Sequence, residues 1–405
     1  MPTDLYLDTA RFGLMAASAR SADADFVRLC GEEGGSVHID ELLQGGADSW
    51  PSGMRRRYGG LAGWQGVGRL KESLGRLAGA PAGTPVLLAG RSAQLMKLAA
   101  AALFRRCGSV LHTDLEWPGY LAVLDAECRR ARGRLVCVPA RDAALREGLG
   151  TADFVRTLAA RYRREQCEGL FLSAVSFDGI RLPVTEVVAL LSHVRPPLFV
   201  VVDGAQALAH LPADLPPCDI YLAGCHKWLG AGHPLGLAVQ PRPGSRSFIG
   251  RLADKMIAAG ILDDPLLGFT GQLERSRQHA FGETVDLAGL FSCGGAVADE
   301  LTCPVTAADR LQSRLVNGDA VVDAARSSGW EPLLPDPCLR SGILLLEGRD
   351  RDVRAAPAEE LRAGFQRHGV AVTTYPGGLA RVSLLSRAWA GRELDQLRRA
   401  LQYCS

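Results

Sequence analysis

The feature that most constrains the fold is a succession of short, continuous apolar runs between Leu61 and Val239, alternating with longer stretches of helical periodicity. Apolar runs without polar alternation are typical of strands buried on both faces, as in a parallel sheet covered by helices. The sequence therefore predicts an α/β fold with a mostly parallel seven-stranded sheet, and ligands are expected beyond the carboxyl ends of its strands. The expected strands are 85–90, 109–113, 134–138, 169–176, 198–203, 219–223 and 235–239.

The C-terminal part has a different character. It contains the apolar runs "SGILLLEG" and "ARVSLL", a helical "APAEELRAGFQRHG" and a last helix "AGRELDQLRRALQYC". This pattern predicts a small α/β domain that follows the large one. We expect an N-terminal arm over residues 1–30, a large domain over 31–300 and a small C-terminal domain over 301–405.

Composition argues against several classes of protein. A hydrophobic content of 47% and a net charge of +2 are ordinary for a soluble globular chain and give no reason to expect nucleic acid as a partner. No apolar run approaches the roughly 20 residues needed to cross a bilayer, and the N-terminus lacks a signal-peptide pattern. The 11 cysteines show no paired spacing, and the 8 histidines show no metal-binding spacing. We therefore expect a cytoplasmic protein with reduced thiols and no metal site.

The stretch "VVDGAQALAHLPADLPPCDIYLAGCHKWLG", residues 201–230, carries the strongest chemical signal. Asp203 ends an apolar run, and Lys227 follows between a histidine and a tryptophan. A desolvated lysine can hold an aldehyde as a Schiff base. Pyridoxal phosphate needs such a lysine and an acid opposite its ring nitrogen. The residue types alone leave other interpretations open.

The D-G-A-Q, H-x-P-x-D and H-K elements of this stretch resemble the cofactor segment of the class V aminotransferases, which are fold-type I pyridoxal phosphate enzymes. The resemblance is to their cysteine desulfurase-like and isopenicillin N epimerase-like branch. It implies that Lys227 forms the Schiff base and that Asp203 pairs with the pyridine nitrogen. It also implies that Gln206 bonds the ring hydroxyl and that His226 reaches the phosphate. Gly224 stands where the family usually has a phosphate-binding serine.

Two further segments resemble the family's cofactor site. The stretch "AGRSAQLMK" loosely matches the phosphate loop, and this implies that Gly90, Arg91, Ser92 and Ala93 border the phosphate at the start of a helix. An ordinary N-cap serine is the alternative for Ser92. In "HTDLEWPGY", Trp117 stands where an aromatic plate covers the cofactor ring. An ordinary core tryptophan is the alternative there.

The remaining site residues follow from the resemblance of shorter stretches. Ser176 in "SAVSFDGIRLPV" stands where the family often has a cofactor-contacting asparagine, and Thr284 in "FGET" where a threonine reaches the partner subunit's phosphate in a homodimer. Arg381 in "LARVSLL" is the candidate for binding the substrate carboxylate, with a structural salt bridge as the alternative. In "YLDTARFG", the backbone of Thr9 and Ala10 would border that carboxylate.

The resemblance implies a pyridoxal phosphate enzyme that acts at Cα of an amino-acid substrate. Transamination is favoured as the commonest reaction of this scaffold, while β-elimination by a C–S lyase and epimerisation stay open. A cysteine desulfurase is disfavoured because "GVAVTTYPGGLAR" lacks the cysteine that would attack the substrate sulfur. The presence of Lys227 and Asp203 argues against a non-catalytic relative. A nicotinamide-dependent dehydrogenase is disfavoured because "AGWQGVG" follows no strand.

Overall fold

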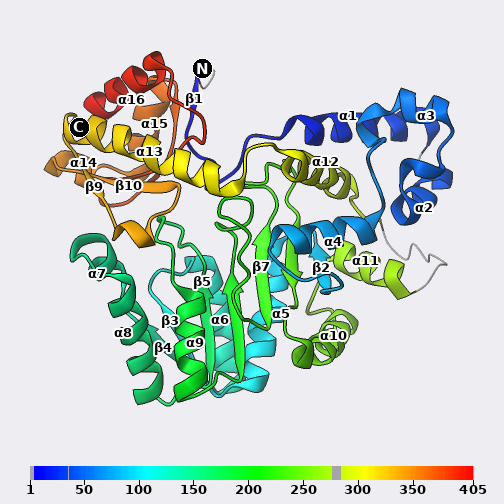
Figure 1. Ribbon diagram of the computed structural model, residues 1–405, viewed down its shortest axis with the longest axis horizontal. Coiled ribbons are helices and arrows are strands. Elements are labelled where there is room, and N and C mark those ends of the chain that lie inside the picture. Colours follow the sequence, from blue (N-terminus) through cyan, green and yellow to red (C-terminus); the bar gives the residue numbers. More distant parts are fainter. Residues whose placement is uncertain (1–3, 35, 276–283, 405) are drawn as a thin grey trace.

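The computed structural model describes residues 4–34, 36–275 and 284–404 (Figure 1). Its largest sheet has seven strands in the order β2-β8-β7-β6-β5-β3-β4. The strands from β7 to β4 are parallel, and β8 runs antiparallel to both of its neighbours. The prediction of a mostly parallel seven-stranded sheet is confirmed. The strands are β2 (Val86–Ala89), β3 (Ser109–Thr113), β4 (Arg134–Val138), β5 (Gly169–Ser173), β6 (Phe199–Asp203), β7 (Ile220–Gly224) and β8 (Gly236–Val239).

Both faces of this sheet are buried, which explains the continuous apolar runs. In β6, Val200 and Val202 belong to one apolar cluster, whereas Phe199 and Val201 belong to another. Successive side chains of a strand point to opposite faces, so the two clusters are the two sides of the sheet. The surrounding helices are α4 (Val67–Leu77), α5 (Ser92–Arg106), α6 (Pro118–Ala131), α7 (Arg141–Arg146), α8 (Thr151–Arg164), α9 (Val184–Val194), α10 (Pro243–Ala258), α11 (Pro265–Arg275) and α12 (Ala288–Thr302).

The C-terminal part forms a four-stranded antiparallel sheet in the order β12-β13-β10-β9. It has an apolar cluster of its own, in which Trp330 and Phe365 are fully buried. Its elements are α13 (Ala307–Arg326), β9 (Trp330–Leu333), β10 (Ile343–Gly348), α14 (Arg351–Ala355), α15 (Ala358–Arg367), β12 (Thr373–Tyr375), β13 (Leu379–Ser383) and α16 (Gly391–Tyr403). The C-terminal segments expected from the sequence fall within this sheet and its helices.

The N-terminal residues connect the two parts of the molecule. Strand β1 (Leu5–Tyr6) pairs in parallel with β11 (Val370–Ala371), beside the small sheet, and α1 (Ala17–Glu33) packs along α12 (Figure 1). The chain then continues through α2 (Ser36–Gly45) and α3 (Ser52–Arg57). We call the seven-stranded sheet with its helices the large part, and the C-terminal four-stranded sheet with its helices the small part. The segment expected as an arm over residues 1–30 thus contains a strand beside the small part and most of a helix that packs on the large part.

Candidate active site

A cavity of about 630 Å³ lies at the carboxyl ends of the parallel strands. Its walls come from the large sheet, from β12 and β13, and from the N-terminal segment. Ten of the residues singled out in the sequence line it: Ala10, Arg91, Ser92, Ala93, Trp117, Asp203, Gln206, His226, Lys227 and Arg381. Gly90, Ser176, Thr9 and Thr284 do not.

Asp203 and Lys227 face this cavity from the ends of two paired strands, β6 and β7. Asp203 is buried, and its Oδ1 accepts a hydrogen bond of 2.9 Å from the amide of Ala205. Burial raises the pKa of Asp203, which that hydrogen bond and the charge of Lys227 partly counteract.

The Lys227 amine makes no hydrogen bond or ion pair with any other residue that the structure describes. Burial lowers the pKa of Lys227 to about 8; Asp203 acts in the opposite direction and Arg381 in the same one. A primary amine with this pKa is partly unprotonated near neutral pH, so it can act as a nucleophile toward an aldehyde.

Gln206 is held by its neighbours on both sides of its amide. Its Nε2 donates to the carbonyl of Ala10 at 2.7 Å, and its Oε1 accepts from Trp228 Nε1 at 2.8 Å. Trp228 in turn stacks on the fully buried His210 ring, with 3.7 Å between the centroids. The second N–H of Gln206 remains available to a ligand in the cavity.

His226 also lines the cavity, and its buried Nδ1 has no hydrogen-bond partner in the described part of the chain. Burial, helped by the neighbouring Lys227 charge, lowers the pKa of His226 to about 4, so the imidazole is neutral at physiological pH. Position 224 leaves little room for a serine, because a Cβ at Gly224 would lie 3.0 Å from His226 Cε1. The imidazole therefore fills the space beside position 224.

The start of α5 forms a polar cradle. Arg91 is the N-cap, and the first helical residues Ser92 and Ala93 follow at the cavity wall. Unpaired N–H groups at a helix N-terminus favour an anion such as a phosphate. Gly236 of β8 permits this arrangement, because a Cβ there would lie 2.4 Å from the Ser92 nitrogen.

Gly90, in contrast, faces away from the cradle. Its N–H donates to Asp264 Oδ1 at 3.1 Å, so it is not available to a ligand. Tyr120 was not singled out in the sequence, although its hydroxyl donates to Ser92 Oγ at 2.9 Å and it lines the cavity. Its position three residues after Trp117, on the first turn of a helix, was the signal that could have identified it.

Aromatic side chains cover one side of the cavity. Trp117 is the N-cap residue of α6 and is 46% exposed, so part of its ring is free to stack on a ligand. Phe177 meets Trp117 edge to face at 5.6 Å and Tyr375 of β12 at 5.8 Å. Neither Phe177 nor Tyr375 was assigned from the sequence.

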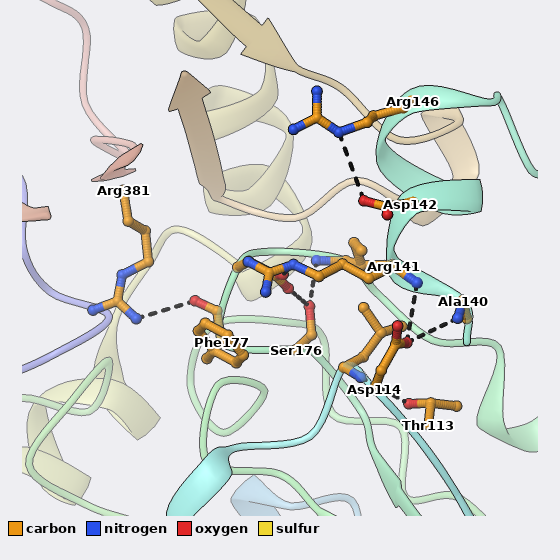
Figure 2. A network of polar contacts seen from close by, with 12 residues as sticks. Thr113, Asp114, Ala140, Arg141, Asp142, Arg146, Ser176, Phe177 and Arg381 are labelled. Carbon is orange, nitrogen blue, oxygen red and sulfur yellow. Dashed lines mark hydrogen bonds and ion pairs between the residues drawn. The ribbon is translucent and has the colours of Figure 1, made fainter. Parts of the chain in front are cut away.

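Arg381 on β13 is only 3% exposed, yet it lines the cavity. Its Nη1 donates to the carbonyl of Phe177 at 3.0 Å (Figure 2). Its Nη2 donates to Thr373 Oγ1 at 3.3 Å and lies 3.5 Å from Asp8 Oδ1. The buried Nε has no partner in the described part of the chain.

A buried carboxyl group lies behind the cavity. Glu116 accepts hydrogen bonds from the hydroxyls of Thr113, at 2.8 Å, and of Ser173, which itself lines the cavity. Burial raises the pKa of Glu116 to about 8, and the charge of Asp203 adds to this shift. The Glu116 carboxyl is therefore largely protonated at neutral pH.

Some of the predicted site residues have other contacts, or lie outside the cavity. The Ser176 hydroxyl lies outside the cavity because it donates to Asp178 and accepts from the amide of Ile180 at 2.9 Å, closing a local turn. Thr9 does not line the cavity. Ala10 does line it, and its N–H donates to Ser383 Oγ while its carbonyl accepts from Gln206. Thr284 is exposed, while Phe281–Glu283 of the same motif lie outside the described residues.

The described residues offer neither a metal-ion site nor a helix that could span a membrane. No group of three or more His, Cys, Asp or Glu side chains within residues 4–34, 36–275 and 284–404 is arranged to hold a metal ion. Within the same ranges, every helix is too short or too polar to cross a bilayer.

A model of the family "Aminotransferase class-V" matches residues 96–239, about a third of the chain. This segment includes Trp117, Asp203 and Lys227. The match supports the class V family that the sequence motifs indicate and does not distinguish its branches. No curated protein shows significant sequence similarity to the chain.

Solved structures share the architecture over nearly the whole chain. The cystine C–S lyase C-DES has a TM-score of 0.69 at 15% identity, covering 98% of this chain and 97% of the lyase. A variant of C-DES carries glycine covalently linked to its pyridoxal phosphate cofactor. A cysteine desulfurase from Escherichia coli gives 0.66 at 15% identity over 98% and 94% of the two chains.

A ureidoglycine–glyoxylate aminotransferase from Bacillus subtilis has a TM-score of 0.65 at 12% identity, covering 100% of this chain and 93% of the aminotransferase. At such low identities these likenesses establish the fold and nothing finer. The chain has the fold of the fold-type I pyridoxal phosphate enzymes.

Proposed function

We propose that the chain is a pyridoxal phosphate enzyme of the class V aminotransferase family, and that it transfers the amino group of an amino acid. One observation carries the proposal: a lysine with a pKa lowered to about 8 and a buried aspartate face a single cavity from adjacent strand ends. The family match over residues 96–239 supports it independently.

The residues of the cavity fit the cofactor at each of its functional groups. Asp203 suits a protonated ring nitrogen, and the free N–H of Gln206 suits the ring hydroxyl. The first N–H groups of α5 and the unpaired Nδ1 of His226 suit the phosphate. Trp117 presents a partly exposed ring for stacking.

When bound, pyridoxal phosphate supplies an electron sink for negative charge at the substrate Cα. The chain contributes the remaining chemistry. Lys227 would hold the cofactor through its amine, and the same amine could move a proton to and from the substrate Cα. Arg381 would bind the α-carboxylate and so orient the substrate Cα in the cavity. Trp117, Phe177 and Tyr375 limit the access of water.

The second candidate function is β-elimination by a C–S lyase, which the likeness to the cystine C–S lyase favours. Desulfuration through a persulfide is disfavoured because none of the described residues that line the cavity is a cysteine. Transamination and elimination share Lys227, Asp203 and Arg381 and differ in where the proton and the β-substituent go.

We also propose a cytoplasmic homodimer in which Thr284 contributes to the partner subunit's phosphate site. The exposed position of Thr284, outside the cavity of its own chain, is compatible with this role. Substitution Thr284→Ala should then weaken cofactor binding while leaving the sedimentation velocity of the dimer unchanged. Unaltered cofactor affinity would remove Thr284 from the site.

The proposed cofactor can be tested by absorption spectroscopy. Protein mixed with excess pyridoxal phosphate and then desalted should retain a visible band that borohydride abolishes. Lys227→Ala should retain no borohydride-reducible band, whereas Lys255→Ala, which removes an exposed lysine of α10, should behave as wild type. A wild-type chain without a bound chromophore would refute the proposal.

The reaction can be decided by a screen of amino acids. Formation of pyridoxamine phosphate without ammonia would support transamination. Release of ammonia together with a keto acid would select elimination, and exchange of the Cα hydrogen together with inversion at Cα would select epimerisation.

A further inference from the structure

The turn over residues 175–181 joins the two parts of the molecule next to Arg381. An isolated bridge between Val175 and Arg181 closes it. The small part of the chain holds the turn from outside, because Arg181 donates its N–H to the carbonyl of Leu339 at 2.8 Å. At the tip of the turn, the Phe177 carbonyl accepts the hydrogen bond of 3.0 Å from Arg381 (Figure 2). The position of this turn therefore fixes one side of the Arg381 guanidinium.

Within the turn, Asp178 is a carboxylate whose side chain is fully buried. Its Oδ1 accepts from the Ser176 hydroxyl, and its Oδ2 lies 2.8 Å from Nε of Arg141, its cationic partner among the described residues. Removing the partner of a buried charge is strongly destabilising, because the remaining charge is left without compensation.

Arg141 begins α7 and reaches the turn in two ways (Figure 2). Besides the ion pair with Asp178, its guanidinium carbon lies 5.2 Å from the centroid of the Phe177 ring. Its own backbone is fixed as well, since its N–H donates to Asp114 Oδ1 at 3.0 Å. Arg141 thus contacts the side chains of both Phe177 and Asp178, although it does not line the cavity.

We infer that Arg141 is a positioning residue for substrate binding, which holds the turn that carries the Phe177 carbonyl and thereby orients Arg381 toward the substrate α-carboxylate. The inference rests on the proposed function, because that function gives Arg381 its role. Arg141 touches neither Lys227 nor Asp203 in the structure, so its loss should affect carboxylate binding more than the chemical step.

The experiment compares four variants of the full chain loaded with pyridoxal phosphate. Arg141→Met removes the cation, Arg141→Lys keeps it, and Arg141→Met/Asp178→Asn removes both charges of the pair. Arg156→Met is the control, since it breaks an exposed Arg–Asp pair on α8. Steady-state kinetics use the best amino acid from the screen, and calorimetry measures the binding of propionate, a carboxylate without an amine.

Arg141→Met should raise KM by about tenfold and weaken propionate binding in parallel, with kcat changed by no more than about twofold. Arg141→Lys should recover most of this loss. The double variant should also bind better than Arg141→Met, because it leaves no uncompensated buried charge, and it serves as the test if Arg141→Met does not fold. Arg156→Met should match wild type.

The inference would be overturned by an unchanged KM and propionate affinity in Arg141→Met. A fall confined to kcat, or a double variant no better than Arg141→Met, would overturn it as well. Failure of the proposed function has a different signature, since the wild-type chain itself would then lack the visible band and turn over no amino acid.

Discussion

At the scale of single residues, the central quantity is the pKa of the Lys227 amine, which burial lowers from 10.5 to about 8. Only the unprotonated amine attacks an aldehyde, so covalent capture of pyridoxal phosphate should accelerate as pH rises, with a midpoint near 8. Stopped-flow absorbance with cofactor-free protein measures this rate. Because the Asp203 charge raises the Lys227 pKa, Asp203→Asn should move the midpoint lower still. A midpoint near 10 would contradict the desolvated amine.

Glu116 gives a second prediction, for stability. Its pKa in the folded chain is raised from 4.5 to about 8, so the folded state holds the proton more tightly than the unfolded state. The contribution of Glu116 is therefore fully present below pH 4.5 and is lost as pH rises toward 8. Glu116→Gln removes this titration, so between pH 5 and 8 its unfolding free energy should rise relative to that of wild type by roughly 3–4 kcal/mol.

Urea unfolding at several pH values measures the difference between wild type and Glu116→Gln. The comparison isolates position 116, because other buried carboxyls such as Asp203 titrate in both proteins. A difference that stays constant with pH would show that Glu116 is ionised in the folded chain.

The sequence predicted those cavity residues that lie at or near the ends of strands. It did not predict those that reach the cavity only through the packing of distant segments. Asp203 and Lys227 could be predicted because Asp203 is the last residue of one buried strand and Lys227 lies three residues beyond the end of the next. Ser176 was predicted to contact the cofactor, whereas in the structure its hydroxyl donates to Asp178, a contact that residue types do not reveal. Phe177 and Tyr375 meet only when two separate sheets come together, and no local pattern indicates this.

At the scale of elements, the polar cradle at the start of α5, the proposed phosphate site, depends on how closely β8 approaches it. A Cβ at Gly236 would lie 2.4 Å from the Ser92 nitrogen, so Gly236→Ala should push the two elements apart. The expected result is an affinity for pyridoxal phosphate weakened by about tenfold or more, measured by equilibrium titration. Gly250→Ala on α10, where an added Cβ meets no atom within 4 Å, is the matched control.

If Gly236→Ala bound the cofactor as tightly as Gly250→Ala does, the start of α5 would not be the phosphate site. The existence of both elements was predictable, since β8 is an apolar run and α5 has a helical pattern. The antiparallel direction of β8 was not predictable, because a strand buried on both faces has the same continuous apolar pattern whether it is parallel or antiparallel to its neighbours.

At the scale of the whole molecule, the N-terminal segment connects the small sheet to the loop that carries Lys227. Strand β1 pairs with β11, and the N–H of Ala10 donates to Ser383 Oγ at the end of β13. The same segment then crosses to the large part, where the N–H of Gly13 donates to the carbonyl of His226 at 2.8 Å. The sequence suggested only an arm here, because these contacts join residues several hundred positions apart.

At Gly13 the N-terminal segment passes so close to the backbone of Lys227 that no side chain fits. A Cβ at Gly13 would lie 1.8 Å from the Lys227 carbonyl oxygen, which is backbone and cannot turn aside. Gly13→Ala should therefore displace the segment or the lysine loop, lower the unfolding free energy by about 1–3 kcal/mol and reduce retention of pyridoxal phosphate after desalting. Urea unfolding and the visible absorbance per chain measure the two effects.

The control for this prediction is Gly31→Ala, which lies in α1 with no atom near an added Cβ. Because glycine is less favourable than alanine inside a helix, Gly31→Ala should raise the unfolding free energy by about 0.5–1 kcal/mol and leave cofactor retention unchanged. Loss of cofactor in Gly13→Ala but not in Gly31→Ala would show that the position of Lys227 depends on the passage of the N-terminal segment between the two sheets. Equal retention in both variants would mean that Lys227 keeps its position without that segment.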